Sequence, residues 1–391
     1  MNTTITRHPL PYRVRRLAAV AMALGLTLGV AAGRASAETE DWKQSPLPVS
    51  DANIVTIAQP DQHTTWAAGA TVTAVPGKEG ALMFKPLLLA KDERTDQGWK
   101  VVSIPDDTTY NRINAMSTRG PDDAWLVGDN DTRAGSGNAI LTEHWDGTAW
   151  YKVTAPVPAD TVSAGFLSVA AVGPNDAWAA GWRQTQDSVP GLLEHWDGTA
   201  WNQAALPAGT DDLILNAVAA TAADDIWVAG YHNSTDQPAL LHGDGHSWQL
   251  VNLPKTGRYG ELNTLAVGGR NDVWAAGRTA LTATDGGSPL LEHWNGRSWQ
   301  AVKAPGTGEV RGAALTSRGL TLVGDHLDGP APYGWRFDGT QWESLGLPTF
   351  GSENTSLLAV ADTRDGLVSV GAYKNADEYL VHPLMLTSTA P

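Results

Sequence analysis

The chain has 391 residues, and 42 acidic against 27 basic side chains give it a formal net charge of −15. This excess of negative charge argues against a nucleic-acid partner or an anionic membrane, because both would repel it. The sequence has no cysteine, which excludes disulfides, thiolate metal sites and a cysteine nucleophile. Seventeen Trp against four Phe, together with 41 Gly, is far from average usage and indicates a repeated motif.

Residues 1–37 have the pattern of a secretory signal peptide. Three arginines between residues 13 and 16 form a basic segment, residues 17–33 are apolar, and Ala35-Ser36-Ala37 fits a cleavage site of small residues. A membrane anchor is the alternative, but the apolar run is short for a span and no second run follows it. We therefore expect a secreted, extracellular chain of residues 38–391 without membrane insertion.

Two motifs recur after this segment at a spacing of about 50 residues. The first is a short apolar run that ends in glycine, at Gly69, Gly128, Gly181, Gly230, Gly277, Gly324 and Gly371. The second is a tryptophan that opens a short strand, at Trp42, Trp99, Trp150, Trp201, Trp248, Trp299 and Trp342. Each motif therefore occurs seven times.

Each repeat contains four short predicted strands in a fixed order. In one copy they cover residues 166–172, 177–181, 192–196 and 201–205, with the turn Asp197-Gly198-Thr199-Ala200 before the last strand. Asp-Gly between two apolar strands is a hairpin signal, because glycine accepts the positive φ of a tight turn. Four antiparallel strands in roughly 40–50 residues are typical of a β-propeller blade.

The two ends of the chain supply complementary parts of one blade. The last repeat begins at Leu357 and stops before a Trp-led fourth strand, whereas residues 41–46 form a fourth strand that lacks its other three. We therefore predict one all-β domain over residues 38–391. It is a seven-bladed β-propeller of four-stranded antiparallel blades, with its ring closed by the N-terminal strand, which removes exposed sheet edges.

Most tryptophans stand at repeated positions, where we expect them to pack between blades. The triplet Glu-His-Trp recurs at residues 143–145, 194–196 and 292–294. Equivalent positions in different blades lie far apart around a ring, so these triplets do not combine into a four-ligand metal site. We expect hydrogen bonds near the hairpins and predict no metal site and no cofactor, although the sequence leaves Ca²⁺ open.

Recognition is expected on the face where the loops vary, because binding residues concentrate on variable loops held by a rigid frame. Trp182 begins such a loop directly after a repeated glycine, and Trp335 replaces the glutamate of the triplet. These two tryptophans depart from the pattern and are therefore better ligand candidates than the others. The remaining predicted ligand residues directly follow a repeated glycine (one residue further on for Tyr373) or begin an inner strand: Asp129, Tyr231, Arg278, Asp325, Tyr373, Asn114, Asn216 and Asn263.

This combination of aromatic rings, amides and carboxylates suits a sugar. Ring faces stack on its CH groups, and polar side chains bind its hydroxyls. The alternative is that the three asparagines only cap strands.

Evidence for catalysis is weak in the sequence. There is no G-x-S-x-G elbow, no H-E-x-x-H motif and no P-loop. A glycoside hydrolase needs only two carboxylates, and Asp129, Asp131, Asp325 and Asp328 could supply them at the channel. The turn W-D-G-T-x-W resembles the Asp-box of sialidases but departs from it, since Gly147 follows Asp146 directly. We predict a protein that is not an enzyme and keep a secreted glycoside hydrolase as an alternative.

The segments GPNDAWAAGW (residues 173–182) and LLEHWDGTAW (residues 192–201) resemble the secreted seven-bladed propellers of actinobacteria, and most of all the lectin subunits of umbrella toxin particles. The resemblance covers residues 42–391. It implies a non-catalytic, lectin-like subunit that binds a cell-surface glycan and docks on a small adaptor protein joined to a large toxin subunit. Without a Gly-Asp-Ser-Gly-Gly stretch, this chain would be the form that lacks a trypsin-like domain. A stand-alone protein-interaction scaffold is the remaining alternative.

Overall fold

The computed structural model describes residues 41–389, apart from 79–80, 96, 106–110, 131–139, 255–256, 283–286, 327–328 and 365. The predicted signal peptide, Asp131 and Asp328 therefore lie outside the described residues. Within the described part of the chain, every regular element is a β-strand.

After an N-terminal strand β1 (Asp41–Gln44), the strands occur in consecutive groups of four. The first three groups are β2 (Ala52–Asp61), β3 (Thr64–Ala74), β4 (Leu82–Asp92) and β5 (Lys100–Val102); β6 (Asn111–Gly120), β7 (Asp123–Asn130), β8 (Thr142–Trp145) and β9 (Trp150–Lys152); and β10 (Ser163–Gly173), β11 (Asp176–Gln184), β12 (Gly191–Trp196) and β13 (Trp201–Gln203).

The next three groups are β14 (Leu213–Ala222), β15 (Asp225–His232), β16 (Gln237–Gly243) and β17 (Trp248–Leu250); β18 (Tyr259–Gly269), β19 (Asp272–Ala280), β20 (Ser288–Trp294) and β21 (Trp299–Ala301); and β22 (Glu309–Thr316), β23 (Gly319–Asp325), β24 (Pro332–Phe337) and β25 (Trp342–Ser344). The last three strands are β26 (Asn354–Thr363), β27 (Gly366–Lys374) and β28 (His382–Thr389).

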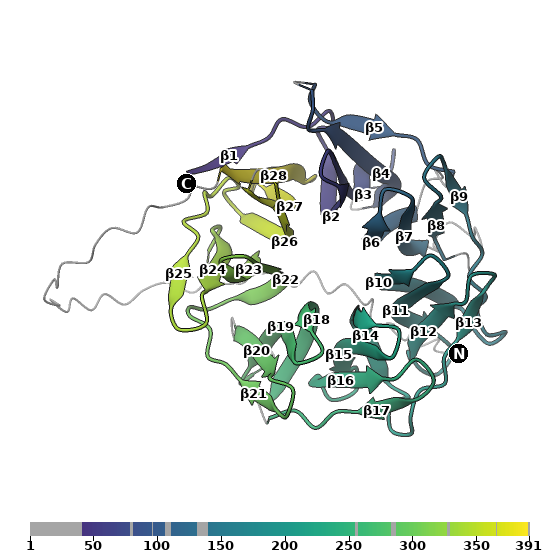
Figure 1. The fold of residues 1–391 in the computed structure, drawn as a ribbon. Coiled ribbons are helices and arrows are strands. Elements are labelled where there is room, and N and C mark those ends of the chain that lie inside the picture. The colour runs from purple at the N-terminus through teal and green to yellow at the C-terminus, as the bar shows by residue number, and fades with distance from the viewer. Residues whose placement is uncertain are drawn as a thin grey trace, which may run out of the picture. The chain divides into compact units, whose positions relative to one another are not determined.

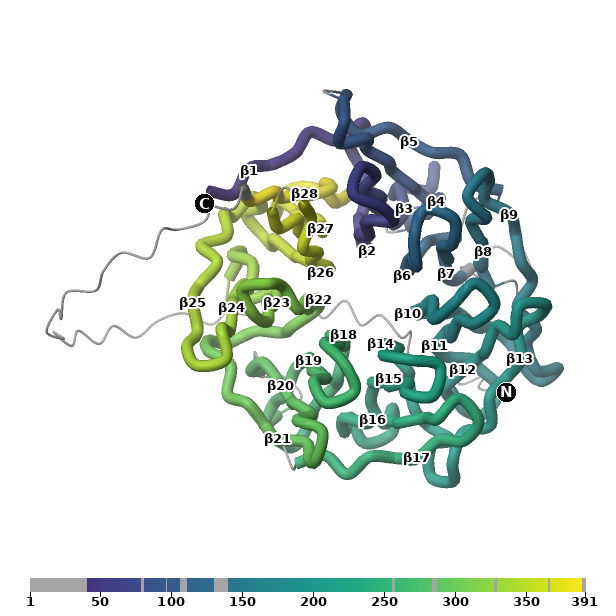
Figure 2. Tube along the Cα trace, viewed as in Figure 1, coloured from purple at the N-terminus to yellow at the C-terminus, as the bar shows by residue number. Residues whose placement is uncertain are grey.

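Strands pair antiparallel in chain order within each group. The exception is the last sheet, whose order is β1-β28-β27-β26. The β6–β9 and β10–β13 groups join into one eight-stranded sheet through the single pair Gly165↔Asp129. The first strand of each group lies toward a common centre and the last toward the outside (Figure 1), and connectors lead from each outer strand to the next inner strand (Figure 2). The all-β class and the four-stranded antiparallel units are therefore confirmed.

A bulge in each inner strand explains the repeated glycine. In β10 the pairing with β11 shifts register between Phe166 and Ser168, and all six other inner strands carry the same shift. The bulge moves a carbonyl group toward the second strand, so a Cβ on Gly181 would lie 2.0 Å from the oxygen of Gly165. Only glycine tolerates so close an approach of the two backbones.

The core lies between neighbouring groups. Trp125 and Val127 of β7 pack against Phe166 of β10 and Leu192 of β12, and Trp201 closes the cluster on the outside. Each leucine or phenylalanine buried in this way contributes roughly 1.5–3 kcal/mol. The tryptophans at repeated positions pack between groups, as predicted.

The first and last groups also pack against each other. Ile54 of β2 and Leu89 of β4 share a cluster with Val370 of β27 and Met385 of β28. Strand β1 pairs with β28 over four residues, and Trp42 Nε1 donates a hydrogen bond of 2.8 Å to the carbonyl of Leu345 in the preceding group. The N-terminal strand therefore joins two segments from the end of the chain.

Candidate functional site

The variable loops and the connectors between groups lie on one face, which we call the variable face. Because the strands are antiparallel, the loop from second to third strand and the connector into each inner strand emerge from the same edge of the sheet. The predicted site residues that follow a repeated glycine come at the end of a second strand, near this edge. Each lies directly opposite a residue of the inner strand, in the pairs Arg112↔Asp129, Gly165↔Trp182, Ile214↔Tyr231, Glu261↔Arg278 and Glu309↔Asp325.

Asp129 is buried, with 4% of its surface exposed, and it forms a two-pronged ion pair. Its carboxylate oxygens each accept a hydrogen bond of 2.7 Å from Nε and Nη2 of Arg112. Asn114 Nδ2 also donates to it at 3.3 Å. Paired, planar hydrogen bonds of this kind hold a carboxylate in a fixed orientation. The structure thus brings Asp129 and Asn114 together and ties both to the inner strand.

The three predicted asparagines link neighbouring groups. Each stands at the bulge of an inner strand, and its Nδ2 donates to the carbonyl just before the bulge of the next group. Asn114 reaches Phe166 at 2.8 Å, Asn216 reaches Leu262 at 2.9 Å and Asn263 reaches Val310 at 3.0 Å. Their amide N–H groups are therefore used within the frame, which favours the strand-capping alternative.

A second ionic cluster surrounds Glu309, a residue that the sequence did not single out. Its Oε1 accepts a hydrogen bond of 2.9 Å from Asn263 and lies 3.0 Å from Arg311 Nη1, while Arg311 Nε lies 3.3 Å from Asp325 Oδ2. Burial raises the pKa of Glu309, and the charge of Arg311 opposes this rise. Glu309 occupies the strand position of Arg112, so only its place in the repeat could have indicated a polar cluster here.

Arg278 stands one group before this cluster. Its Nε lies 3.6 Å from Glu261 Oε1. Asn263 and Asp325 are brought together around Glu309 and Arg311, and the charges of Arg278 and Glu261 also act on the Glu309 carboxyl group. Each of the three predicted residues is engaged with a neighbouring side chain or carbonyl.

Trp182 does not stand on an exposed loop, and the prediction that it begins one is wrong. Trp182 lies within β11, where it pairs with Gly165 of β10, and it is 7% exposed. Trp335 lies within β24 opposite Leu322, where it is half-buried in the cluster around Trp274. Strand pairing continues past the repeated glycine, and the apolar pattern did not reveal this.

Tyr231 and Tyr373 are half-buried at the variable face. Tyr373 belongs to a small aromatic cluster, with ring centroids 5.8 Å from Phe350 and 4.9 Å from His382. Tyr379, on the loop of the same β27–β28 hairpin, is 50% exposed. This hairpin carries the most accessible aromatic ring of the described loops.

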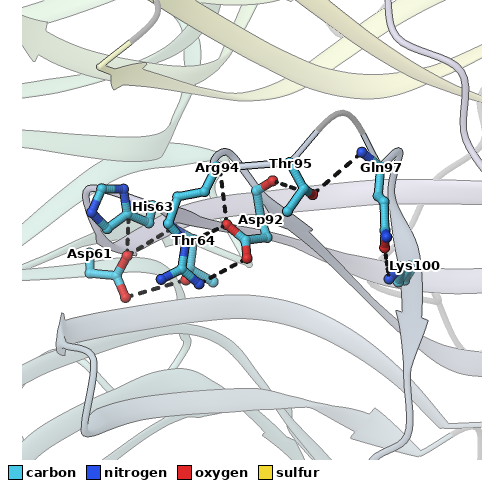
Figure 3. Close-up of polar contacts among 8 residues, drawn as sticks. All are labelled: Asp61, His63, Thr64, Asp92, Arg94, Thr95, Gln97 and Lys100. Carbon is cyan, nitrogen blue, oxygen red and sulfur yellow. Dashed lines mark hydrogen bonds and ion pairs between the residues drawn. The ribbon is translucent and has the colours of Figure 1, made fainter.

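Turns on the opposite face bind their own backbone. In the β2–β3 turn, Asp61 Oδ1 accepts hydrogen bonds from the backbone N–H groups of His63 and Thr64 at 2.7 and 2.8 Å (Figure 3). In the β4–β5 loop, the hydrogen bonds of Arg94 lower the pKa of Asp92 to about 2. The same turn chemistry recurs at Asp146, Asp197, Asp244, Asn295 and Asp338. The side-chain oxygens of these residues already accept hydrogen bonds within the local turns.

The histidines of four groups also have structural partners, as predicted. Nε2 of each lies 2.7–2.8 Å from an aspartate at the start of the second strand, in the pairs His144–Asp123, His195–Asp176, His242–Asp225 and His293–Asp272. Each imidazole also lies against a tryptophan, with centroids 3.9–4.4 Å apart. Among the described residues, no three His, Asp or Glu side chains converge to hold a metal ion.

The sequence patterns did not predict two cavities and three exposed apolar side chains that the structure shows. A polar cavity of about 380 Å³ lies beside Arg183, and a second one of about 420 Å³ lies beside Leu281. The large apolar side chains exposed on described loops are Val162, Leu281 and Tyr379, at 47, 74 and 50%. All three loops belong to the variable face. They lie outside the repeated motifs, so no pattern marked them.

In the part of the chain that the structure describes, no helix has the length and apolar character to cross a membrane. No protein-family model matches the chain, and neither does any curated protein. Solved structures do match it, at low sequence identity.

YCF48 bound to D1 peptide is 15% identical with a TM-score of 0.54, covering 90% of this chain and 97% of that one. The RRP9 WD40 repeats are 11% identical with a TM-score of 0.57, covering 90% and 99%. A catalytically inactive virginiamycin B lyase from Staphylococcus aureus with quinupristin is 10% identical with a TM-score of 0.54, covering 89% and 99%. At such low sequence identity these similarities show only the fold, which is that of a β-propeller.

Proposed function

We propose that this protein is a secreted, non-catalytic recognition module that binds a partner protein through its variable face. The observation that carries the proposal is the distribution of exposed apolar side chains. Val162, Leu281 and Tyr379 all stand on variable-face loops, whereas the described turns of the opposite face expose no large apolar side chain. The other large apolar side chains that are exposed, Val101, Tyr151 and Leu250, lie on the outer strands β5, β9 and β17. We take the three apolar side chains of the variable-face loops as separate contact points for a partner protein.

The frame behind this surface is proposed to be a closed, seven-bladed ring. Support comes from the seven repeats in the sequence, from the pairing of β1 with β28 and from the shared cluster of the first and last groups. A closed ring holds loops from different blades at fixed distances, so a partner meets a preformed surface. The solved structure of YCF48 with D1 peptide is a precedent for a ligand-binding propeller.

Capture from the culture supernatant of the producing organism tests this function. The tagged mature protein is compared with a Leu281→Asp/Tyr379→Asp variant, and bound proteins are identified by mass spectrometry. Leu250→Asp is the matched control, because Leu250 is 43% exposed but lies on the outer strand β17. We expect a partner that the wild type and the control retain and the double variant loses. Equal recovery by all three proteins contradicts the proposal.

A carbohydrate-binding role is the second candidate, favoured by the aromatic cluster of Tyr373, Phe350 and His382 beside the exposed Tyr379. In this case the protein is a lectin-like subunit of a toxin particle. The same capture experiment would recover a small adaptor and a large toxin subunit. Binding of the protein to cell-surface glycans would fall in Tyr379→Ala and Tyr373→Ala, and unchanged binding in both variants rejects this site.

A further inference from the structure

Charged side chains are segregated along the variable face. The loops over residues 153–162, 185–190, 204–212 and 233–236 carry acidic side chains and no basic one: Asp160, Asp187, Asp211, Asp212 and Asp236. The loops over residues 345–353 and 375–381 also carry only acidic charges, from Glu353, Asp377 and Glu378. We call these the first and the second acidic loops.

The loops that lie between them in chain order have the opposite sign. Of residues 251–258, 281–287 and 302–308, the described ones include Arg258 and Lys303 and no acidic side chain. We call these the basic loops. Since the groups of strands follow one another around the common centre in chain order (Figure 1), the variable face changes from acidic to basic and back to acidic along this path.

Many of these charges have no counter-charge within the fold. Asp160 pairs with Arg183 at 2.8 Å and Glu353 pairs with Lys374 at 2.7 Å, so strand residues balance these two acids. Five others are exposed and form no ion pair in the part of the chain that the structure describes: Asp187, Asp211, Asp377, Arg258 and Lys303. A partner therefore meets available charges of both signs.

Each exposed apolar side chain of this face lies among charges of one sign. Val162 follows Asp160 by two residues and belongs to the first acidic loops, and Tyr379 directly follows Glu378 in the second. Leu281 belongs to the basic loops. Charges around an apolar contact steer association and fix the orientation of a partner more than they add to affinity.

The repeated frame by itself does not define how a partner is rotated on it. Each group has the same strand pattern, and its connector and hairpin leave from the same edge. A partner turned by one group would still meet similar backbone loops. Its charges would not match, because like charges would then be held close together at a cost in free energy. The charge pattern therefore distinguishes one rotation from the others.

We propose that the partner protein of the variable face carries separated charges, basic opposite Val162 and Tyr379 and acidic opposite Leu281, and that this pattern fixes its rotation on the repeated frame. The inference rests on the proposed binding of a partner protein and adds the charge pattern of that partner. A uniformly basic partner is disfavoured, since Arg258 and Lys303 would repel it.

Association rates of charge-reversed variants test the inference. The probe is the protein that the wild type retains and Leu281→Asp/Tyr379→Asp loses from the culture supernatant, purified and measured by biolayer interferometry. Asp187→Lys/Asp211→Lys reverses two acidic charges, and Arg258→Glu/Lys303→Glu reverses two basic ones. We expect both variants to associate at least about fivefold more slowly at about 0.05 M NaCl, and the difference to shrink at about 0.5 M, where screening is strong. A partner attracted only by net charge would associate more slowly with one variant and faster with the other.

The controls make the same charge changes on the opposite face. Asp122→Lys/Asp362→Lys and Arg297→Glu/Arg364→Glu replace exposed side chains at or beside its turns, and both should associate at a rate close to that of the wild type. Opposite shifts in the two test variants, no shift in at least one of them, or equal shifts in the controls overturn the charge pattern and leave partner binding intact. If the wild type retains no protein that Leu281→Asp/Tyr379→Asp loses, the proposed function fails and this inference fails with it.

Discussion

At every repeated glycine, a carbonyl oxygen of the bulged inner strand occupies the space that a Cβ would need. The distance from the ideal Cβ to that oxygen is between 1.8 and 2.0 Å at all seven glycines. Neither backbone can move away without breaking the ladder between the two strands. The glycine is thus required by close approach and not by a positive φ.

Substitution at Gly181 tests this explanation. We expect Gly181→Ala to lower the free energy of unfolding by more than about 3 kcal/mol, since the added methyl overlaps the Gly165 carbonyl. Gly209→Ala is the control: its φ is +85° but its Cβ would meet open space, so a loss of only about 1–2 kcal/mol is expected. Urea unfolding of both variants measures the difference. Equal losses would rule out the overlap as the cause.

The amide of Asn263 offers a second test among single residues. Asn263→Ala removes the hydrogen bonds to Val310 and Glu309, and it leaves the buried Val310 carbonyl without this donor. We expect a loss of about 1–3 kcal/mol in the free energy of unfolding. Asn202→Ala, on the exposed β12–β13 hairpin, should cost much less. A loss at Asn263 no larger than at Asn202 would show that the inter-group bond is not stabilising.

For single residues, the repeats predicted the position in the fold better than the contacts of the side chain. The post-glycine residues were correctly placed at the variable edge, but their partners could not be read from a linear pattern. The partners that surround each one decide its environment: Trp182 pairs with Gly165 inside the ladder, and Arg112 neutralises Asp129. These pairings depend on the register of the bulge, which the sequence does not display.

Strands were predicted well where apolar residues mark them. The apolar segments 166–172 and 192–196 fall within β10 and β12. The ends were wrong for physical reasons: β11 extends to Gln184 because polar residues continue the ladder with Ser163, and β13 stops at Gln203 because the chain turns toward the next group. Backbone pairing needs no apolar side chain, so hydrophobic patterning does not mark where it ends.

The hairpin before each outer strand makes a prediction about acid stability. Hydrogen bonds from the following residues, led by Thr148 and by the backbone N–H of Ser247, lower the pKa of Asp146 and Asp244 to about 2. Because these folded-state pKa values lie below the unfolded value of 3.8, the turns stabilise the fold above that pH. This contribution is lost as the pH falls toward 2.

Asn295 shows how to remove that dependence. Its Oδ1 accepts the same two backbone hydrogen bonds without titrating. A variant with Asp146→Asn, Asp197→Asn and Asp244→Asn should therefore have a lower free energy of unfolding than the wild type near neutral pH, because it lacks the contribution of the ionised carboxylates, and should lose less of it between pH 4 and pH 2. Thermal unfolding across that interval measures the slope. A slope equal to that of the wild type would contradict the assignment.

For the whole molecule, we expect the pairing of the N-terminal strand β1 with β28 to be needed to close the ring of sheets. Beginning the chain at Pro46 removes β1, the Trp42 hydrogen bond to Leu345 and the pairing along β28. The bare edge of β28 should then lower the melting temperature and promote association, as unpaired strand edges do. Light scattering and thermal unfolding, against a chain that begins at Glu38, measure both effects. A monomer of unchanged stability would show that β1 is dispensable.

Buried glutamates between groups make stability depend on pH in the opposite direction. Glu194 of β12 is fully buried beside Leu192 and Trp196, and neither carboxylate oxygen has a hydrogen-bond partner. Burial raises its pKa to about 8, and that of the equivalent Glu292 to about 7. Three other groups place leucine at this position: Leu89, Leu241 and Leu386.

The folded protein therefore keeps protons that the unfolded chain releases above a pKa of about 4.5. Since the folded state binds more protons in this interval, the free energy of unfolding should fall as the pH rises from about 5 to about 8. Glu194→Leu/Glu292→Leu should be flat over the same interval and more stable at pH 8 by roughly 1–4 kcal/mol. Glu194→Gln/Glu292→Gln separates charge from polarity. It should also be flat, but less stable than the leucine variant, because it still buries unpaired amides. If the free energy of unfolding changed with pH in the same way in the wild type and both variants, ionisation of these carboxyl groups would not destabilise the fold, which contradicts the prediction.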